Sequence, residues 1–160
     1  MTSTAKARKP GPTTRAAARL GAVQALYQMD LAGTDVGETL AQFATRAQGE
    51  DFDGGQCGEA DTKLLREVVE GAVREQSTLD PAVDHILDKD WPLHRLDATV
   101  RAILRAAAYE LMFREATPAK VAITEYVAVA DAFFGAEEPR FVNGVLNALA
   151  RQRRPAEFGL

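Results

Sequence analysis

Apolar residues return every three or four positions through most of this chain, and this spacing constrains the fold more than any other feature. The clearest stripe lies between 97 and 114 and comprises Val100, Ile103, Leu104, Ala107, Leu111 and Met112. Such spacing places apolar side chains on one face of an α-helix. No segment of useful length alternates with the two-residue period of a strand. The pattern therefore predicts an all-α protein, a compact bundle of about seven helices.

The remaining helices are predicted from the same spacing together with capping residues and glycine stops. Asp80 followed by Pro81, for example, is typical of a helix start. The predicted helices span about 14–32, 36–47, 61–75, 80–89, 118–134 and 140–151.

The chain has 160 residues, enough for one domain with a sizeable core. We expect this helical domain to span 14–154. A basic, Pro- and Gly-containing arm at 1–13 is predicted to be disordered, and a short tail at 155–160 is predicted to be flexible. The stretch at 48–59 is rich in glycine and is predicted to be a loop.

One dipeptide conflicts with the helical pattern. Asn143-Gly144 between apolar residues is a strong hairpin signal. The apolar residues around it nevertheless keep helical spacing, so we predict that both residues lie inside the last helix. Glycine would be explained there if a neighbouring helix approached its backbone closely, and Gly21 could serve the same purpose in the first helix. The alternative is a weak helical turn at the surface.

Charge is segregated along the chain. The net charge is -4, yet all but one of the 23 acidic residues lie between Asp30 and residue 150, and the remaining one is Glu157. Both ends of the chain are therefore cationic. A basic arm is typical of proteins that bind a polyanion such as nucleic acid, although a solvated tail has the same composition.

Signatures of catalysis or metal binding are missing. His85 and His94 lack the cysteine partners of a zinc site, and the acidic start of the loop from Asp51 to Gly55 does not continue as a calcium loop. We therefore expect no metal, no cofactor and no enzymatic activity. Cys57 is the only cysteine, and no apolar run is long enough to span a membrane. These features favour a cytoplasmic protein.

Three blocks of sequence, taken together, are familiar. They are A-V-Q-A-L-Y at 22–27, I-L-R-A-A-A-Y-E-L at 103–111, and the long block at 118–146 that ends in R-F-V-N-G-V-L. In order and spacing the chain resembles the NusB family of bacterial transcription antitermination factors. The resemblance implies an all-helical fold without catalysis. It also implies binding to boxA RNA of ribosomal RNA leader transcripts, pairing with the small-subunit ribosomal protein NusE, and membership of the RNA polymerase antitermination complex.

Two positions depart from the family pattern. The arginine-dense cluster of the first helix is diluted here to Arg15-Ala-Ala-Ala-Arg19, and Thr124 replaces the usual asparagine before Glu125. The first departure concerns RNA binding directly, because fewer cations remain in that helix.

Candidate RNA-binding residues are found at both ends of the chain. Arg15 and Arg19 are four residues apart, which places them about 6 Å from each other on one helical face, where they could bind neighbouring phosphates. Arg140 and Phe141 follow Pro139 at a predicted helix start, which favours phosphate binding and base stacking, although Phe141 could equally belong to the core. The candidates are completed by Lys6, Arg8 and Lys9 of the arm.

A partner-binding surface is predicted on the helix from 97 to 114. Arg101, Arg105 and Glu110 lie beside its apolar stripe and could face NusE, or they could simply be solvated. The resemblance leaves alternatives open. One is a protein-interaction scaffold of NusB-like fold that lacks strong RNA binding. Another is the NusB-like module of some RNA methyltransferases, which we disfavour because the chain contains no methyltransferase domain.

Overall fold

The computed structural model describes residues 14–49 and 59–160, and for 44–49 and 59–61 it describes the backbone alone. Within these residues the chain forms seven α-helices and no strand, which confirms the all-helical prediction. None of the described helices combines the length and the apolar character that a membrane span requires. The helices are α2 (Thr14–Ala32), α3 (Val36–Gly49), α4 (Glu59–Arg74), α5 (Gln76–Asp84), α6 (Ala98–Phe113), α7 (Ala119–Phe133) and α8 (Glu137–Arg153), with 3-10 helices η1 (Leu93–Arg95) and η2 (Pro155–Phe158).

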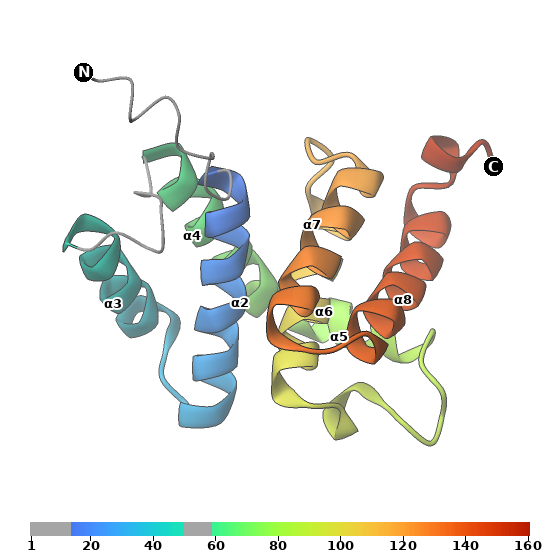
Figure 1. Ribbon diagram of the computed structural model, residues 1–160, viewed down its shortest axis with the longest axis horizontal. Helices are drawn as coiled ribbons and strands as arrows, with labels where there is room; N and C mark the ends of the chain where they lie inside the picture. Colours follow the sequence, from blue (N-terminus) through green and yellow to red (C-terminus); the bar gives the residue numbers. More distant parts are fainter. Residues whose placement is uncertain (1–13, 50–58) are drawn as a thin grey trace.

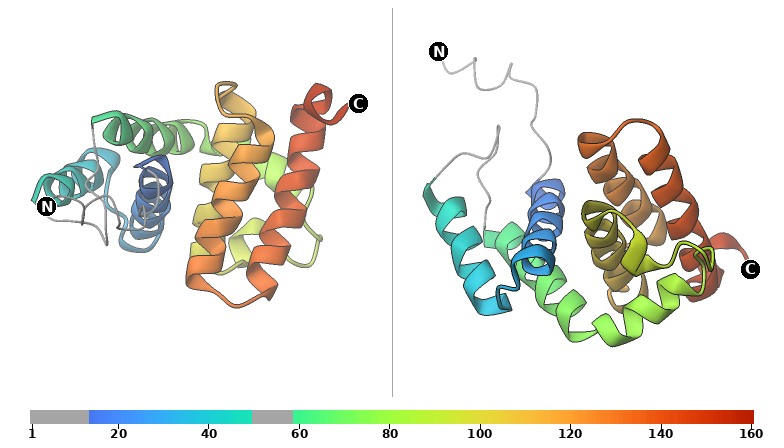
Figure 2. Two further views of the ribbon diagram at one scale, coloured as in Figure 1. Left: turned by 45° about the horizontal axis from the view of Figure 1, so that its top comes forward. Right: turned by 90° about the horizontal axis from the view of Figure 1, so that it is seen from below.

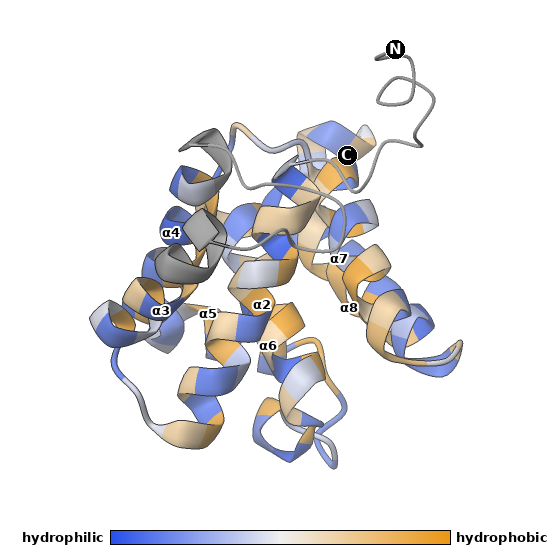
Figure 3. Ribbon diagram, turned by 60° about the vertical axis from the view of Figure 1, so that its left-hand side comes forward, coloured by the Kyte–Doolittle hydropathy of each residue, from blue (hydrophilic) through white to orange (hydrophobic). Residues whose placement is uncertain are grey.

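The helices form two groups that meet along α6. Helices α2, α3 and α4 lie on one side, and α7 and α8 pack with α6 on the other (Figures 1 and 2). Helix α6 contacts α2, α4, α5, α7 and α8, and nearly all of its residues from Ala102 to Leu111 are buried. Each helix carries both hydrophobic and hydrophilic positions (Figure 3), as expected for a bundle whose helices bury one face. The central position of α6 explains its nearly continuous apolar sequence.

Two glycines permit close packing between α4 and its neighbours, and for Gly21 this packing was predicted from the sequence. A Cβ atom on Gly21 of α2 would lie 2.7 Å from the Cδ1 atom of Leu65, so the proposal of close packing at Gly21 is confirmed. A Cβ atom on Gly71 of α4 would lie 2.2 Å from the ring of Tyr109 in α6.

Gly144 behaves differently from the expectation. Asn143 and Gly144 do lie inside α8, as predicted. However, nothing lies within 4 Å of a Cβ atom built on Gly144, and the residue is exposed. The prediction of a helix packed against Gly144 is therefore wrong. Asn143 is also exposed, and its backbone and side-chain oxygens accept hydrogen bonds from the Asn147 amide one turn later.

Two predicted boundaries also need correction. Helix α5 begins at Gln76, before the predicted start at Asp80, and Pro81 lies inside it. The carboxylate of Asp80 accepts two hydrogen bonds from Arg105 of α6, so it serves a tertiary contact. At the C-terminus, part of the tail expected to be flexible forms η2, and Phe158 packs against the core. The predicted arm at 1–13, with Lys6, Arg8 and Lys9, lies outside the described residues, as does most of the predicted loop at 48–59.

Candidate nucleic-acid interface

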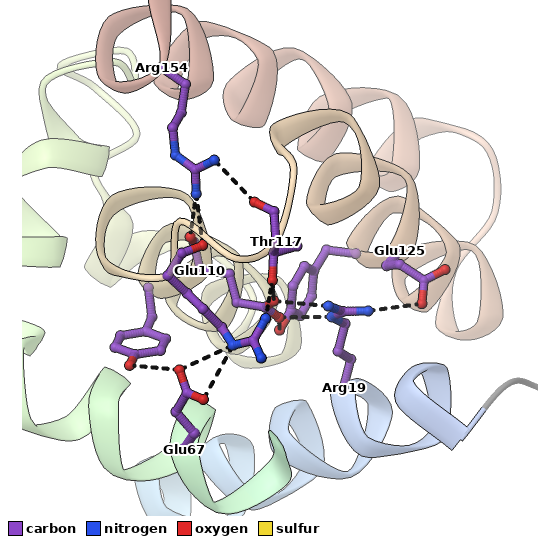
Figure 4. A network of polar contacts seen from close by, with 9 residues as sticks. Arg19, Glu67, Glu110, Thr117, Glu125 and Arg154 are labelled. Atoms are coloured by element: carbon purple, nitrogen blue, oxygen red, sulfur yellow. Dashed lines mark hydrogen bonds and ion pairs between the residues drawn. The ribbon is translucent and has the colours of Figure 1, made fainter. Parts of the chain in front are cut away.

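Arg19 lies inside the protein, in a network of polar contacts between the two helical groups (Figure 4). Its side chain is only 2% exposed, and its Nε and Nη2 atoms donate to the two carboxylate oxygens of Glu110 in α6 at 2.8 and 3.0 Å. Its Nη1 atom donates to Glu125 of α7 at 3.2 Å. This geometry is a bidentate arginine–carboxylate pair with a second acid beside it, the strongest arrangement for such a contact.

The buried carboxylate of Glu110 accepts hydrogen bonds from three side chains. Besides Arg19, it accepts hydrogen bonds from the hydroxyls of Thr117 and Tyr126. Burial alone would raise the pKa of Glu110, but the bonds from Arg19 and Tyr126 lower its pKa below the ordinary value. Burial and the nearby carboxylate raise the pKa of Tyr126 well above its ordinary value. At neutral pH, Glu110 is therefore ionised and the Tyr126 hydroxyl remains a donor.

The network of polar contacts continues from the Arg19–Glu110 pair to α4. Arg114, in the turn after α6, donates to the Thr117 hydroxyl at 2.6 Å and forms an ion pair with Glu67 of α4 at 3.1 Å. The Tyr109 hydroxyl donates to the same carboxylate at 3.2 Å. These contacts hold α2 and α4 in a defined position against α6 and the turn before α7.

This geometry corrects two assignments made from the sequence. Arg19 cannot bind phosphate in this conformation, because its guanidinium is buried and already paired. Glu110 is fully buried, so it cannot contact a protein partner. A signal was available for Arg19, since Ala22, Val23 and Leu26 share its helical face and are all buried.

The other two predicted partner residues also make contacts within the chain. Arg101 pairs with Asp30 at the end of α2, with 2.7 Å between Nη2 and Oδ2, and donates to the carbonyl of Leu96 at 2.9 Å. Arg105 pairs with Asp80 of α5 at 2.9 Å. Both arginine side chains are only 14% exposed. They hold α6 to its neighbours, so the predicted face does not exist as an exposed surface.

Exposed cations gather where α2 and α7 begin and α8 ends, which is one end of the bundle (Figure 1). We call this region the cationic end. None of its cations forms an ion pair with a described residue. They are Arg15 in the first turn of α2, Lys120 in the first turn of α7, and Arg151 and Arg153 in the last turn of α8.

Two of these cations, Arg15 and Lys120, occupy positions that are unfavourable for the stability of their helices. A helix N-terminus carries partial positive charge and favours acidic residues, yet Arg15 and Lys120 occupy first turns that contain no acid. Two positive helix ends and the cations in their first turns therefore lie at the same end of the bundle. Two acidic residues also lie in this region. The carboxylate of Glu157 accepts hydrogen bonds from Arg154 and from the amide of Ala119, whereas Glu115 is exposed. The arrangement is suited to an anionic ligand.

Arg140 and Phe141 lie at the opposite end of the bundle, where α8 begins (Figure 1). The structure therefore does not bring them together with Arg15. Phe141 is 40% exposed, which excludes the core alternative. Helix α8 starts at Glu137 rather than at Arg140, so Glu137 and Glu138 occupy its first turn. These carboxylates would repel a phosphate there.

Phe141 instead lines an open groove that the sequence did not reveal. The groove has a volume of about 570 Å³ and lies between the segment at 87–97, the start of α6 and the start of α8. Trp91, which is 55% exposed, provides a second large apolar surface and packs under the guanidinium of Arg95. The carboxylates lining the groove belong to Asp88, Asp97, Glu137 and Glu138. We call this site the acidic groove.

Comparison with known proteins agrees with this fold. The model of the NusB family matches residues 16–151. Among curated proteins, transcription antitermination protein NusB of Rhizobium rhizogenes is 50% identical over 88% of this chain and 88% of its own length. The NusB protein of Agrobacterium fabrum is 51% identical over 88% of this chain and 85% of its own length.

Solved structures show the same architecture. NusB of T. maritima superposes with a TM-score of 0.76 at 27% identity, covering 91% of this chain and 97% of that chain. A chain from a crystal structure of antitermination factors NusB and NusE in complex with double-stranded RNA gives a TM-score of 0.75 at 24% identity, covering 87% and 97%. The second likeness shows the shared fold. With a matching family model and half-identical relatives over most of its length, the chain belongs to the NusB family of transcription antitermination proteins, which are not enzymes.

Proposed function

We propose that the protein is a cytoplasmic antitermination factor that binds boxA RNA of ribosomal RNA leader transcripts together with the ribosomal protein NusE. In this role it supports processive transcription by RNA polymerase. Family membership supplies the general activity. The observation that carries RNA binding in this chain is the cationic end, where two helix N-termini and exposed cations lie at one end of the bundle. The basic residues Lys6, Arg8 and Lys9 precede α2 in the sequence and would add to the positive charge available to RNA.

The acidic groove is our candidate for the NusE site. The groove combines carboxylates with the exposed rings of Trp91 and Phe141, so it would complement a basic protein partner. Aromatic anchors at the centre and complementary charge at the rim are typical of protein interfaces. We therefore assign Phe141 to the protein partner rather than to RNA, and we replace the face predicted at Arg101, Arg105 and Glu110 by this groove.

The alternative of a scaffold without strong RNA binding gains support from one observation. Burial of Arg19 leaves Arg15 as the only exposed arginine of α2. The two readings differ in whether the purified protein binds RNA in a salt-dependent manner.

A salt titration with boxA RNA tests the proposal. We expect wild-type protein to bind boxA RNA more tightly than a scrambled RNA. Replacing Arg15 by alanine should weaken binding and lower the slope of log K against log salt by about 0.7, the value for one phosphate of a single strand. Fluorescence anisotropy at several salt concentrations measures both quantities.

Lys89→Ala is the matched control, because Lys89 is an exposed cation near the acidic groove. This variant should keep the wild-type slope. Absence of RNA binding by the wild-type protein, with and without NusE, would support the scaffold reading. Equal slopes for wild type and Arg15→Ala would place the RNA away from the start of α2.

A further inference from the structure

The chain end after α8 is held in place by two charged residues. The guanidinium of Arg154 donates to the carbonyls of Glu110, Leu111 and Arg114 at 2.9–3.0 Å, so it binds the C-terminal end of α6 and the residue that follows it. It also pairs with Glu157 at 2.6 Å. The Glu157 carboxylate accepts from the amide of Ala119 at the start of α7, and this bond and Arg154 lower its pKa below the ordinary value. η2 is thereby fixed between the ends of α6, α7 and α8.

Fixing η2 places an aromatic ring beside an exposed arginine. The guanidinium carbon of Arg151 lies 5.1 Å from the centroid of the Phe158 ring. Phe158 is partly buried and packs against the core, whereas Arg151 is exposed and forms no ion pair with a described carboxylate. The ring therefore restricts the guanidinium to one region of the surface, at the cationic end. Pre-ordering of this kind reduces the entropy that a ligand contact would cost.

We propose that Arg151, supported by Phe158, is a stacking position for an unpaired base of single-stranded RNA. The inference rests on the RNA binding proposed above and adds a residue that distinguishes single-stranded from paired RNA. Unpaired bases stack on aromatic rings and on arginine guanidinium planes, and base pairing makes the same faces inaccessible. Arg153 does not share this role, because two residues correspond to about 200° around a helix and place it on another face of α8.

A lysine substitution separates stacking from charge. Arg151→Lys keeps the positive charge but removes the planar group. We expect it to weaken binding of a short single-stranded boxA RNA roughly tenfold, because the contact with one stacked base is lost. The salt slope should stay at the wild-type value, whereas Arg151→Ala should lower both affinity and slope. Arg74→Lys is the matched control, because Arg74 is an exposed arginine in the last turn of α4 and is not part of the cationic end, and it should bind like wild type. Fluorescence anisotropy measures these affinities, and far-UV circular dichroism checks the fold.

The same RNA annealed to its complement provides the second arm of the experiment. Arg151→Lys should bind this duplex as wild type does, since no unpaired base is available. Single-stranded binding within twofold of wild type would overturn the stacking proposal and leave RNA binding by the cationic end intact. An equal loss on single-stranded and duplex RNA would also overturn it, because it would indicate a backbone contact. Failure of wild-type protein to bind either RNA would instead reject the proposed function itself.

Discussion

Replacing Arg19 by methionine should lower the free energy of unfolding by about 3–5 kcal/mol, the usual cost of removing one partner of a buried ion pair. The variant leaves the carboxylate of Glu110 fully buried and without its bidentate partner. Thr117 and Tyr126 would remain as neutral donors and could not replace the lost positive charge. Urea unfolding followed by circular dichroism measures the change.

Two further variants make this result specific. Arg15→Met removes an exposed cation four residues earlier and should change stability by less than about 0.5 kcal/mol. Combining Arg19→Met with Glu110→Gln removes both charges while leaving an acceptor for Thr117, so the double variant should be more stable than Arg19→Met alone. Equal stabilities of Arg19→Met and Arg15→Met would mean that the buried pair does not form.

Gly71→Ala should destabilise the protein by about 1–3 kcal/mol, although alanine is normally the better residue in a helix. The added methyl group would lie 2.2 Å from the Tyr109 ring, well inside van der Waals contact. The ring has little freedom to move, because its hydroxyl donates to Glu67 and its face stacks on Phe113 with centroids 6.0 Å apart. Thermal unfolding would detect this loss as a lower Tm.

Gly144→Ala is the matched control within another helix. Nothing lies within 4 Å of its Cβ position, so alanine should bring only the gain in helix propensity, about 0.5–1 kcal/mol of added stability. A destabilised Gly144→Ala together with a neutral Gly71→Ala would contradict the packing described for both helices.

Periodicity was sufficient to predict the helices, because each helix buries one stripe of apolar residues. It also resolved Asn143-Gly144 correctly: the surrounding apolar spacing extends over several turns, whereas the hairpin signal is local to two residues. The reason given for Gly144 was wrong. A glycine in a helix can lie beneath a neighbour, like Gly71, or on the surface, and only the positions of the other helices distinguish the two cases.

Prediction of the site failed where the argument depended on partners far away in sequence. Arg15 and Arg19 have the helical spacing of a phosphate clamp, but Arg19 meets Glu110, which is 91 residues away. The burial of Arg19 was predictable from the apolar residues on its face, but the identity of its partner was not. The acidic groove is likewise formed by the segment at 87–97 and the start of α8, which come together only in the folded chain.

We have proposed that RNA and NusE bind opposite ends of one small bundle. Amide chemical shifts of the isotope-labelled protein would locate both sites, with boxA RNA and NusE added separately. We expect RNA to shift the first turns of α2 and α7 and the last turn of α8, and NusE to shift the segment at 87–97 and the first turn of α8. RNA-induced shifts centred on Trp91 and Phe141, with the first turn of α2 unchanged, would contradict the account.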